Sequence, residues 1–201
     1  MAATPIRLVV GLGNPGPTYA RTRHNAGFAF IDELARRSGA SLRAESRHQG
    51  ELARARIAEQ DVWLLKPMTY MNLSGASVHS VTAFYRIPLE AVLVAHDELD
   101  FSPGVVRLKH GGGAGGHNGL RDIMARLGDG FWRLRIGIGH PGDRDAVLNY
   151  VLGRPMAAES GLIEEALRAA ADVLPTMLIE GAQKAMNELH SRTAPSSNRP
   201  A

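Results

Sequence analysis

The 201-residue chain carries a net charge of +3, and 44% of its residues are hydrophobic, which is the profile of an ordinary globular protein and not of a disordered chain. It contains no cysteine, so disulfides, thiolate metal sites and cysteine nucleophiles are excluded. No apolar run is long enough for a membrane span and the N-terminus lacks a signal-peptide layout, so we expect a cytoplasmic protein.

Apolar strands and amphipathic helices alternate along the chain. A buried strand over residues 6–11 is followed by a long loop and then by a helix over residues 26–37, which Ser38 and Gly39 close. The remaining expected elements are a hairpin (50–57 and 62–66), a helix (74–85), strands (89–95, 105–109), a helix (120–127), a strand (131–138), a short helix capped by Asp143 and ending near 152, and a mostly helical region (159–189) with possible breaks at Pro175 and Gly181.

This alternation, without repeats or an internal linker, predicts an α/β fold: a single three-layer catalytic domain over residues 1–190, with a mixed, twisted sheet flanked by helices as in phosphorylase-like and hydrolase-like folds. The segment 191–201 is expected to be a disordered tail. Four strands end in polar, glycine-rich loops, after Val10, Leu65, Ala95 and Lys109. Because sites in such sheets form beyond strand ends, we expect these loops to converge on one site.

The first loop contains Gly11, Gly13 and Gly16, which match the G-x-G-x-x-G pattern of dinucleotide-binding proteins. In those proteins a helix begins inside the motif and points its N-terminus at the pyrophosphate. Here Pro15 and Pro17 stand where that helix should start. The pattern therefore does not predict a nucleotide cofactor, and none is expected.

His24 lies at the end of this loop and is the leading candidate for a general base, because imidazole titrates near neutral pH. Asp97, at the end of an apolar strand, could accept a hydrogen bond from that imidazole and orient it. Each residue also has a structural interpretation, His24 as a partner of backbone groups at a helix start and Asp97 as a turn aspartate. No serine or cysteine stands in a nucleophile elbow, so the pair points to water as the attacking group.

Three asparagines, Asn14, Asn72 and Asn118, lie on separate loops of the expected site. An amide can hold a peptide backbone or a developing oxyanion without adding charge, although a lone asparagine is more often a turn residue. The run 111–119 is rich in glycine and could cradle an anion or let a substrate pass close to the backbone. It lacks the G-K-[ST] ending of a nucleotide-binding P-loop.

A metal site built from His24, His96, Asp97 and His117 is conceivable, but their spacing matches no metal-binding motif, and no metal is expected.

Five segments, in order and spacing, resemble the bacterial-type peptidyl-tRNA hydrolase family. They are G-L-G-N-P-G-x-x-Y-x-x-T-R-H-N-A-G, K-P-x-T-Y-M-N-L-S-G, H-D-E-L-D, G-G-G-x-G-G-H-N-G-L-R-D and R-L-R-I-G-I-G-H-P-G. The resemblance covers about residues 8–189. It implies a monomeric, metal-independent α/β enzyme that hydrolyses the ester between a peptidyl group and the terminal ribose of tRNA. One visible departure is Ala114, where many members carry a polar residue.

The resemblance also implies a role for each matching residue. His24 would be the catalytic base and Asp97 its orienting partner. The residues that it places around the substrate are Asn14, Tyr19, Met71, Asn72, His117 and Asn118. Lys109 and Arg135 match a basic pair that clamps a phosphate of the tRNA.

Two rival functions remain open from the residues alone. A non-catalytic RNA-binding module would need no base in a cleft, and a small-molecule esterase would be expected to carry a nucleophile elbow.

Overall fold

The computed structural model describes residues 4–193, which contain one seven-stranded sheet with the order β2-β3-β4-β1-β5-β7-β6. The strands are β1 (Leu8–Gly11), β2 (Arg43–Glu45), β3 (Gly50–Ile57), β4 (Gln60–Pro67), β5 (Val92–Glu98), β6 (Val106–His110) and β7 (Trp132–Gly137). Strands β4, β1, β5 and β7 run parallel to one another, whereas the β2–β3, β3–β4 and β6–β7 pairs are antiparallel. The expected mixed sheet is confirmed.

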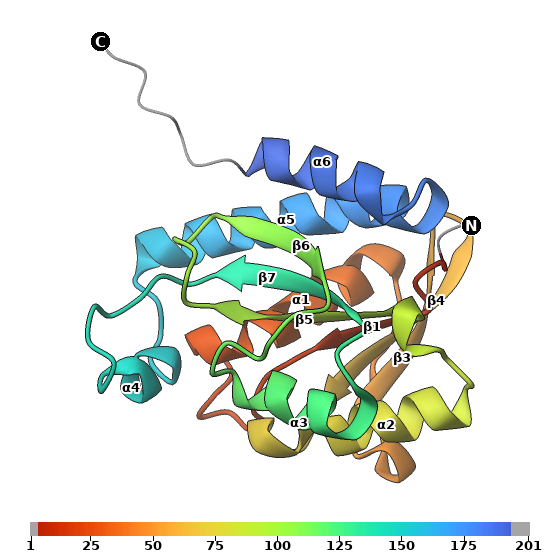
Figure 1. Ribbon diagram of the computed structural model, residues 1–201, viewed down its shortest axis with the longest axis horizontal. Helices are drawn as coiled ribbons and strands as arrows, with labels where there is room; N and C mark the ends of the chain where they lie inside the picture. Colours follow the sequence, from red (N-terminus) through yellow and green to blue (C-terminus); the bar gives the residue numbers. More distant parts are fainter. Residues whose placement is uncertain (1–3, 194–201) are drawn as a thin grey trace.

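Helices cover both faces of this sheet (Figure 1). One face carries α1 (Ala26–Ser38), α5 (Ala157–Ile179) and α6 (Ala182–Arg192), and the other carries α2 (Ser74–Phe84) and α3 (Asn118–Leu127). The short helix α4 (Val147–Val151) lies beyond one edge of the sheet. Single 3-10 turns occur at η1 (Arg23–Asn25), η2 (Ser46–His48), η3 (Met71–Leu73) and η4 (Leu89–Ala91). The three-layer α/β architecture is therefore confirmed.

Each sheet face has its own apolar core because side chains alternate along a strand. In β1, Leu8 and Val10 pack toward α2 and α3, whereas Val9 packs toward α1 and α5. The same alternation in β5 places Asp97 on the α1 face and His96 on the α3 face. The end of β5 therefore presents side chains to the helices on both faces of the sheet.

The carboxyl ends of β1, β4, β5 and β7 share one edge of the sheet, at the left of Figure 1. The strand that ends after Lys109 does not point there, because β6 runs opposite to β7 and His110 pairs with Trp132 at the start of that strand. The glycine-rich segment 111–117 therefore crosses the sheet face to reach the shared edge. The buried Arg133 guanidinium supports this segment through hydrogen bonds to the carbonyl oxygens of Gly112 and Gly113.

Most element predictions are confirmed within a few residues, with three corrections. β5 begins and ends three residues later than expected, so that His96 and Asp97 lie within the strand, where they pair with β7. α5 continues through Pro175, because neighbouring residues such as Leu174 and Met177 are buried against the sheet. The helical region is interrupted only at Gly181, between α5 and α6. α4 begins at Val147, and the Asp143 carboxylate caps no helix but accepts a hydrogen bond from the Asp145 N–H.

The expected tail also starts too early, because α6 extends to Arg192 and Thr193 is buried. The rest of that tail, residues 194–201, lies outside the described residues.

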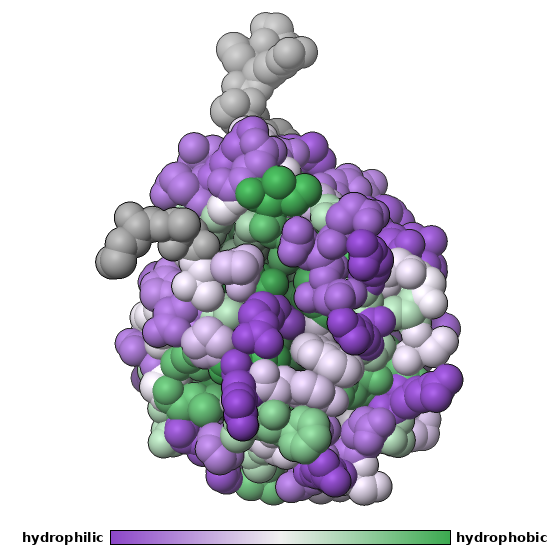
Figure 2. All heavy atoms as spheres, turned by 90° about the vertical axis from the view of Figure 1, so that its right-hand side faces the viewer, coloured by the Kyte–Doolittle hydropathy of each residue, from purple (hydrophilic) through white to green (hydrophobic). Residues whose placement is uncertain are grey.

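The opposite edge of the sheet faces the viewer in Figure 2, where the surface is mainly hydrophilic and apolar side chains gather in a hollow in its upper part. A hollow of about 460 Å³ at this edge is lined by Pro5, Ile6, Met177 and Ile179, among others. Among the described residues that line this hollow, there is no cluster suited to catalysis. Within residues 4–193, no helix is both long and apolar enough to cross a membrane.

Candidate active site

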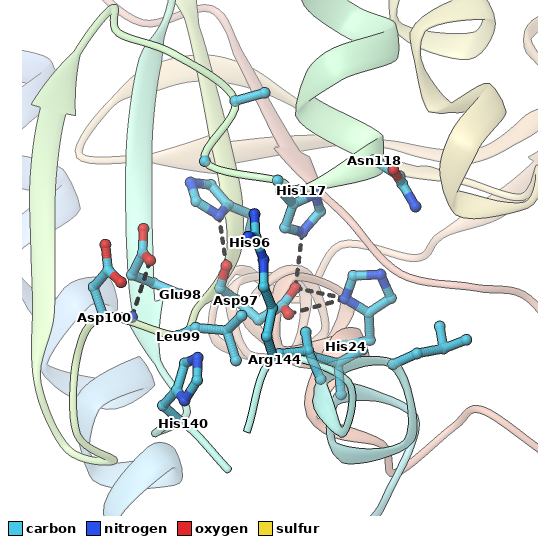
Figure 3. Close-up of a pocket in the computed structure, with 16 residues that line it drawn as sticks. His24, His96, Asp97, Glu98, Leu99, Asp100, His117, Asn118, His140 and Arg144 are labelled. Carbon is cyan, nitrogen blue, oxygen red and sulfur yellow. Dashed lines mark hydrogen bonds and ion pairs between the residues drawn. The ribbon is translucent and has the colours of Figure 1, made fainter. Parts of the chain in front are cut away.

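A cleft of about 590 Å³ opens at the edge where the parallel strands end. Its walls come from the end of β5, the glycine-rich segment, α4 and the residues before α4 (Figure 3). The lining residues are His24, residues 96–100, residues 114–118, His140, Arg144, Val147, Leu148 and Val151. The cleft thus combines ionisable groups on one side with the apolar side chains of α4 on the other.

His24 and Asp97 face each other in this cleft (Figure 3). His24 lies in the turn η1 just before α1, and Asp97 projects from β5 toward the same helix. The His24 Nδ1 atom is 3.0 Å from Oδ1 and 2.9 Å from Oδ2 of Asp97. Because a carboxylate only accepts, Nδ1 carries the proton and Nε2 keeps its lone pair. The Asp97 side chain is only 3% exposed, against 12% for His24, so the acid is buried behind the imidazole.

His117 is a second histidine on the same carboxylate. Its Nε2 donates to Asp97 Oδ1 over 2.9 Å, and its Nδ1 accepts the backbone N–H of Leu120 at the start of α3 over 3.4 Å. These two bonds define its tautomer. Asp97 is therefore oriented by two imidazoles that come from opposite sides of the sheet.

The electrostatics of this group favour a charged Asp97. Burial acts to raise its pKa, but the charges of His117 and His24 and their hydrogen bonds hold that pKa below its usual range. For His24, burial acts to lower the pKa, and the charge and hydrogen bond of Asp97 outweigh it, so the pKa is raised. His96, fully buried beside them, has a pKa lowered to about 3 by burial and by the charge of His117, and it is neutral at pH 7.

Asn14 is buried and holds two loops together. Its Oδ1 accepts the backbone N–H of Met71 over 2.7 Å, which ties the loop after β1 to the turn after β4. Asn25, next to His24, exchanges two 2.9 Å hydrogen bonds with the backbone of Asn14. Asn25 could be assigned no role from the sequence, because its role depends on this long-range contact.

The other expected substrate residues are placed differently. Asn118 lines the cleft and is exposed, and its Oδ1 accepts a hydrogen bond from Arg121. The residues that line this cleft within the described chain do not include Asn14, Tyr19, Met71 or Asn72. Asn72 is exposed, Tyr19 is half-buried, and Met71 is buried in the core beside α3.

A basic pocket of about 240 Å³ adjoins the cleft and shares lining residues such as His96, Glu98 and Ala114 with it. Lys109, Arg133 and Arg135 also line this pocket. Lys109 is exposed, whereas the Arg135 Nε lies 2.9 Å from Glu98 Oε2 and its guanidinium stacks 4.5 Å from the centre of the Phe101 ring. The structure thus brings the expected phosphate-binding pair together, with Arg135 already engaged by an acid.

One other arrangement of the central group is chemically conceivable. One ring nitrogen of His24, a carboxylate oxygen of Asp97 and one ring nitrogen of His117 lie within 4.8 Å of one another, so the three could hold a metal ion. In the structure, the two imidazoles already satisfy the carboxylate through their N–H groups.

Comparison with known proteins adds independent findings. A family model described as peptidyl-tRNA hydrolase matches residues 8–197. The peptidyl-tRNA hydrolase of Erwinia tasmaniensis is 55% identical over 188 residues, which cover 92% of this chain and 96% of the relative. That of Nitrosomonas europaea is 53% identical over 189 residues, covering 94% and 97%. The crystal structure of peptidyl-tRNA hydrolase from Acinetobacter baumannii superposes with a TM-score of 0.89 at 50% identity and covers 94% of this chain and 95% of its own.

Proposed function

The chain belongs to the peptidyl-tRNA hydrolase family, an enzyme family that hydrolyses the ester bond of peptidyl-tRNA, and we propose that His24 and Asp97 carry out this reaction. The observation that supports the assignment most strongly is the 2.9 Å contact of His24 Nδ1 with the buried Asp97 carboxylate at the wall of the cleft. It leaves the His24 Nε2 lone pair free to act as a base.

The proposed reaction needs no protein nucleophile. His24 Nε2 takes a proton from a water molecule, and the water oxygen attacks the ester carbonyl carbon. The tetrahedral intermediate then collapses, breaking the bond to the ribose oxygen, and the His24 imidazolium returns its proton to that leaving oxygen. Asp97 stabilises the imidazolium while it exists, as the acid of a catalytic triad does.

The amides are suited to bind carbonyl oxygens. The Oδ1 atoms of Asn14 and Asn118 already accept hydrogen bonds within the protein, so each NH₂ group is the part of the amide left to donate. We propose that these two and Asn72 hold the peptide backbone and the developing oxyanion. Tyr19, Met71 and His117 would shape the surroundings, His117 by orienting Asp97.

Lys109 and Arg135 are proposed to bind a phosphate of the tRNA. Their pocket adjoins the catalytic cleft. A fixed distance between this pocket and the cleft would select a substrate that carries both an ester and a phosphate.

We further propose that the reaction is metal-independent, because protons on His24 and His117 satisfy the Asp97 carboxylate without a cation. The remaining proposals are that one catalytic domain extends to the end of α6 and that the enzyme acts as a cytoplasmic monomer.

The test is release of peptide from an N-blocked aminoacyl-tRNA, with and without EDTA. His24→Ala should abolish release without loss of the fold, while His79→Ala, which changes an exposed histidine on α2, should keep wild-type activity. Near-normal release by His24→Ala would refute the base assignment, and loss of wild-type activity in EDTA would refute the metal-independent reaction.

A further inference from the structure

Arg23, the residue immediately before His24, is buried, and its side chain points away from the imidazole toward the segment that follows β7. A buried arginine is costly unless its guanidinium is paired. The partners of Arg23 therefore show what this residue contributes.

Those partners lie in α4, directly after it and in the first turn of α5. The Arg23 guanidinium stacks 4.0 Å from the centre of the Tyr150 ring, in α4, and Nη1 donates to the Tyr150 carbonyl oxygen over 3.2 Å. Nη2 forms a 2.8 Å ion pair with Glu159, in the first turn of α5. The backbone N–H of Arg23 donates to the carbonyl oxygen of Gly153, which follows α4.

The same contacts continue into the sheet. The Tyr150 hydroxyl donates to the Ile138 carbonyl oxygen at the end of β7 over 2.7 Å. Glu159 Oε2 also accepts the backbone N–H of Met156, which caps α5. Arg23 thus joins the catalytic turn η1 to helix α4 and the start of α5, and Tyr150 extends this connection to the residue after β7.

Helix α4 matters because Val147, Leu148 and Val151 form the apolar wall of the cleft that also contains His24. The apolar wall on α4 and His24 lie on separate elements, so their separation must stay constant if water and ester are to meet in a productive geometry. The stacking on Tyr150 and the two separate hydrogen bonds of the Arg23 guanidinium supply that connection, and a lysine could not reproduce them.

We propose that Arg23 is a positioning residue, which couples the α4 wall of the cleft to His24 and so maintains the geometry of the reacting groups. The proposal rests on the role of His24 as the base. It assigns to Arg23 no contact with substrate.

The experiment measures kcat and KM on a peptidyl-tRNA for wild type, Arg23→Lys, Glu159→Gln and the double variant. Arg23→Lys should lower kcat about tenfold, since small displacements of reacting groups are expensive, while KM changes less than about twofold. Glu159→Gln should lower kcat by less, roughly threefold, because the stacking on Tyr150 remains. The double variant should be no slower than Arg23→Lys, because both changes act through one contact.

Arg37→Lys is the matched control. Arg37 also joins two helices, through its 2.6 Å ion pair with Asp172 of α5, but it lies at the far end of α1 and should leave kcat unchanged. A wild-type kcat for Arg23→Lys, multiplicative losses in the double variant, or an equal loss in Arg37→Lys would overturn the proposal.

Thermal unfolding of each variant accompanies the kinetics. If Arg23→Lys does not fold, the decision rests on Glu159→Gln: a lower kcat at unchanged KM supports the coupling, and a wild-type kcat overturns it. His24→Ala in the same assay separates the two proposals. Activity in that variant would refute the assignment of His24 as the base. An inactive His24→Ala together with a wild-type kcat for Arg23→Lys would refute only the positioning role of Arg23.

Discussion

Glu98 and Arg135 form an ion pair, with Oε2 and Nε 2.9 Å apart, inside the pocket proposed to bind a phosphate of the tRNA. Both side chains are half-buried, at 17% and 22% exposed, and Glu98 occupies the Arg135 Nε, so the acid competes directly with any phosphate that approaches Arg135. The acid therefore limits how much of the arginine's charge is available to the substrate.

Removing that competition should strengthen binding. Glu98→Gln is expected to tighten tRNA binding about 2–5-fold. This ratio corresponds to the free energy that a partly exposed ion pair usually contributes. The measurement is the Kd of the deacylated tRNA for wild type and variant at one salt concentration. Weaker binding by Glu98→Gln would mean that the acid positions Arg135 for the phosphate.

Lys109→Ala should weaken tRNA binding and reduce its salt dependence, because each lost phosphate contact lowers the slope of log K against log salt by about 0.7–0.9. Arg54→Ala, on the exposed β3–β4 hairpin, is the control and should leave both affinity and slope unchanged. An unaltered slope for Lys109→Ala would remove this lysine from the phosphate site.

Gly27, three residues after His24, allows α1 to approach the strand ends closely. A Cβ built there would lie 2.4 Å from both the Ala95 carbonyl oxygen and the Leu12 nitrogen, which are backbone atoms that cannot move aside. Gly27→Ala should therefore destabilise the protein by about 3 kcal/mol or more in urea unfolding. Gly161→Ala, on α5 where nothing lies within 4 Å, should instead stabilise it by about 0.5–1 kcal/mol. Equal effects of the two changes would contradict the close packing.

His96 should make the fold sensitive to acid. Its pKa is lowered to about 3 in the folded chain, so near pH 5 the unfolded state binds a proton that the native state does not. The stability that the neutral His96 contributes is complete above the ordinary pKa of about 6.5. It is lost as the pH falls, and the free energy of unfolding is lower by about 2 kcal/mol at pH 5. Raised pKa values, such as that of His24, act in the opposite direction and reduce the net loss.

Urea unfolding at pH 7.5 and pH 5 isolates the His96 contribution. His96→Gln should lose about 1–2 kcal/mol less stability between these pH values than wild type does. His79→Gln, on the exposed face of α2, should lose as much as wild type. The assignment fails if His96→Gln has the wild-type pH dependence.

Local signals were sufficient to predict much of this fold. The apolar strands and the helical periodicity of Ile31 and Leu34 report burial directly, and glycine at position 39 adopts the left-handed conformation expected at a helix end. No strand direction was predicted for β6. The connection of residues 99–105 is too short for a crossover between parallel strands, so the sequence did contain the signal for a reversal.

For the candidate site, His24 and Asp97 could be found because their residue types and their places beside strand ends suggest chemistry. Arg23 and Asn25 flank His24 in the sequence, yet their partners lie more than 100 residues away for Arg23 and on another loop for Asn25. Such contacts depend on tertiary packing, which periodicity does not reveal. The Glu98–Arg135 pair could not be predicted from the sequence, because it depends on β5 and β7 being neighbouring strands.

The pH dependence of kcat/KM for wild type and Asp97→Asn tests the central claim most directly. His24 must be neutral to accept a proton, and Asp97 raises its pKa, so wild-type activity should fall with decreasing pH at a midpoint above about 6.5. In Asp97→Asn that midpoint should move to lower pH, and the plateau should fall by about 10²–10⁴-fold because the imidazole loses its orienting acid. Coincident midpoints, or a plateau equal to that of wild type, would contradict the proposal that Asp97 activates His24.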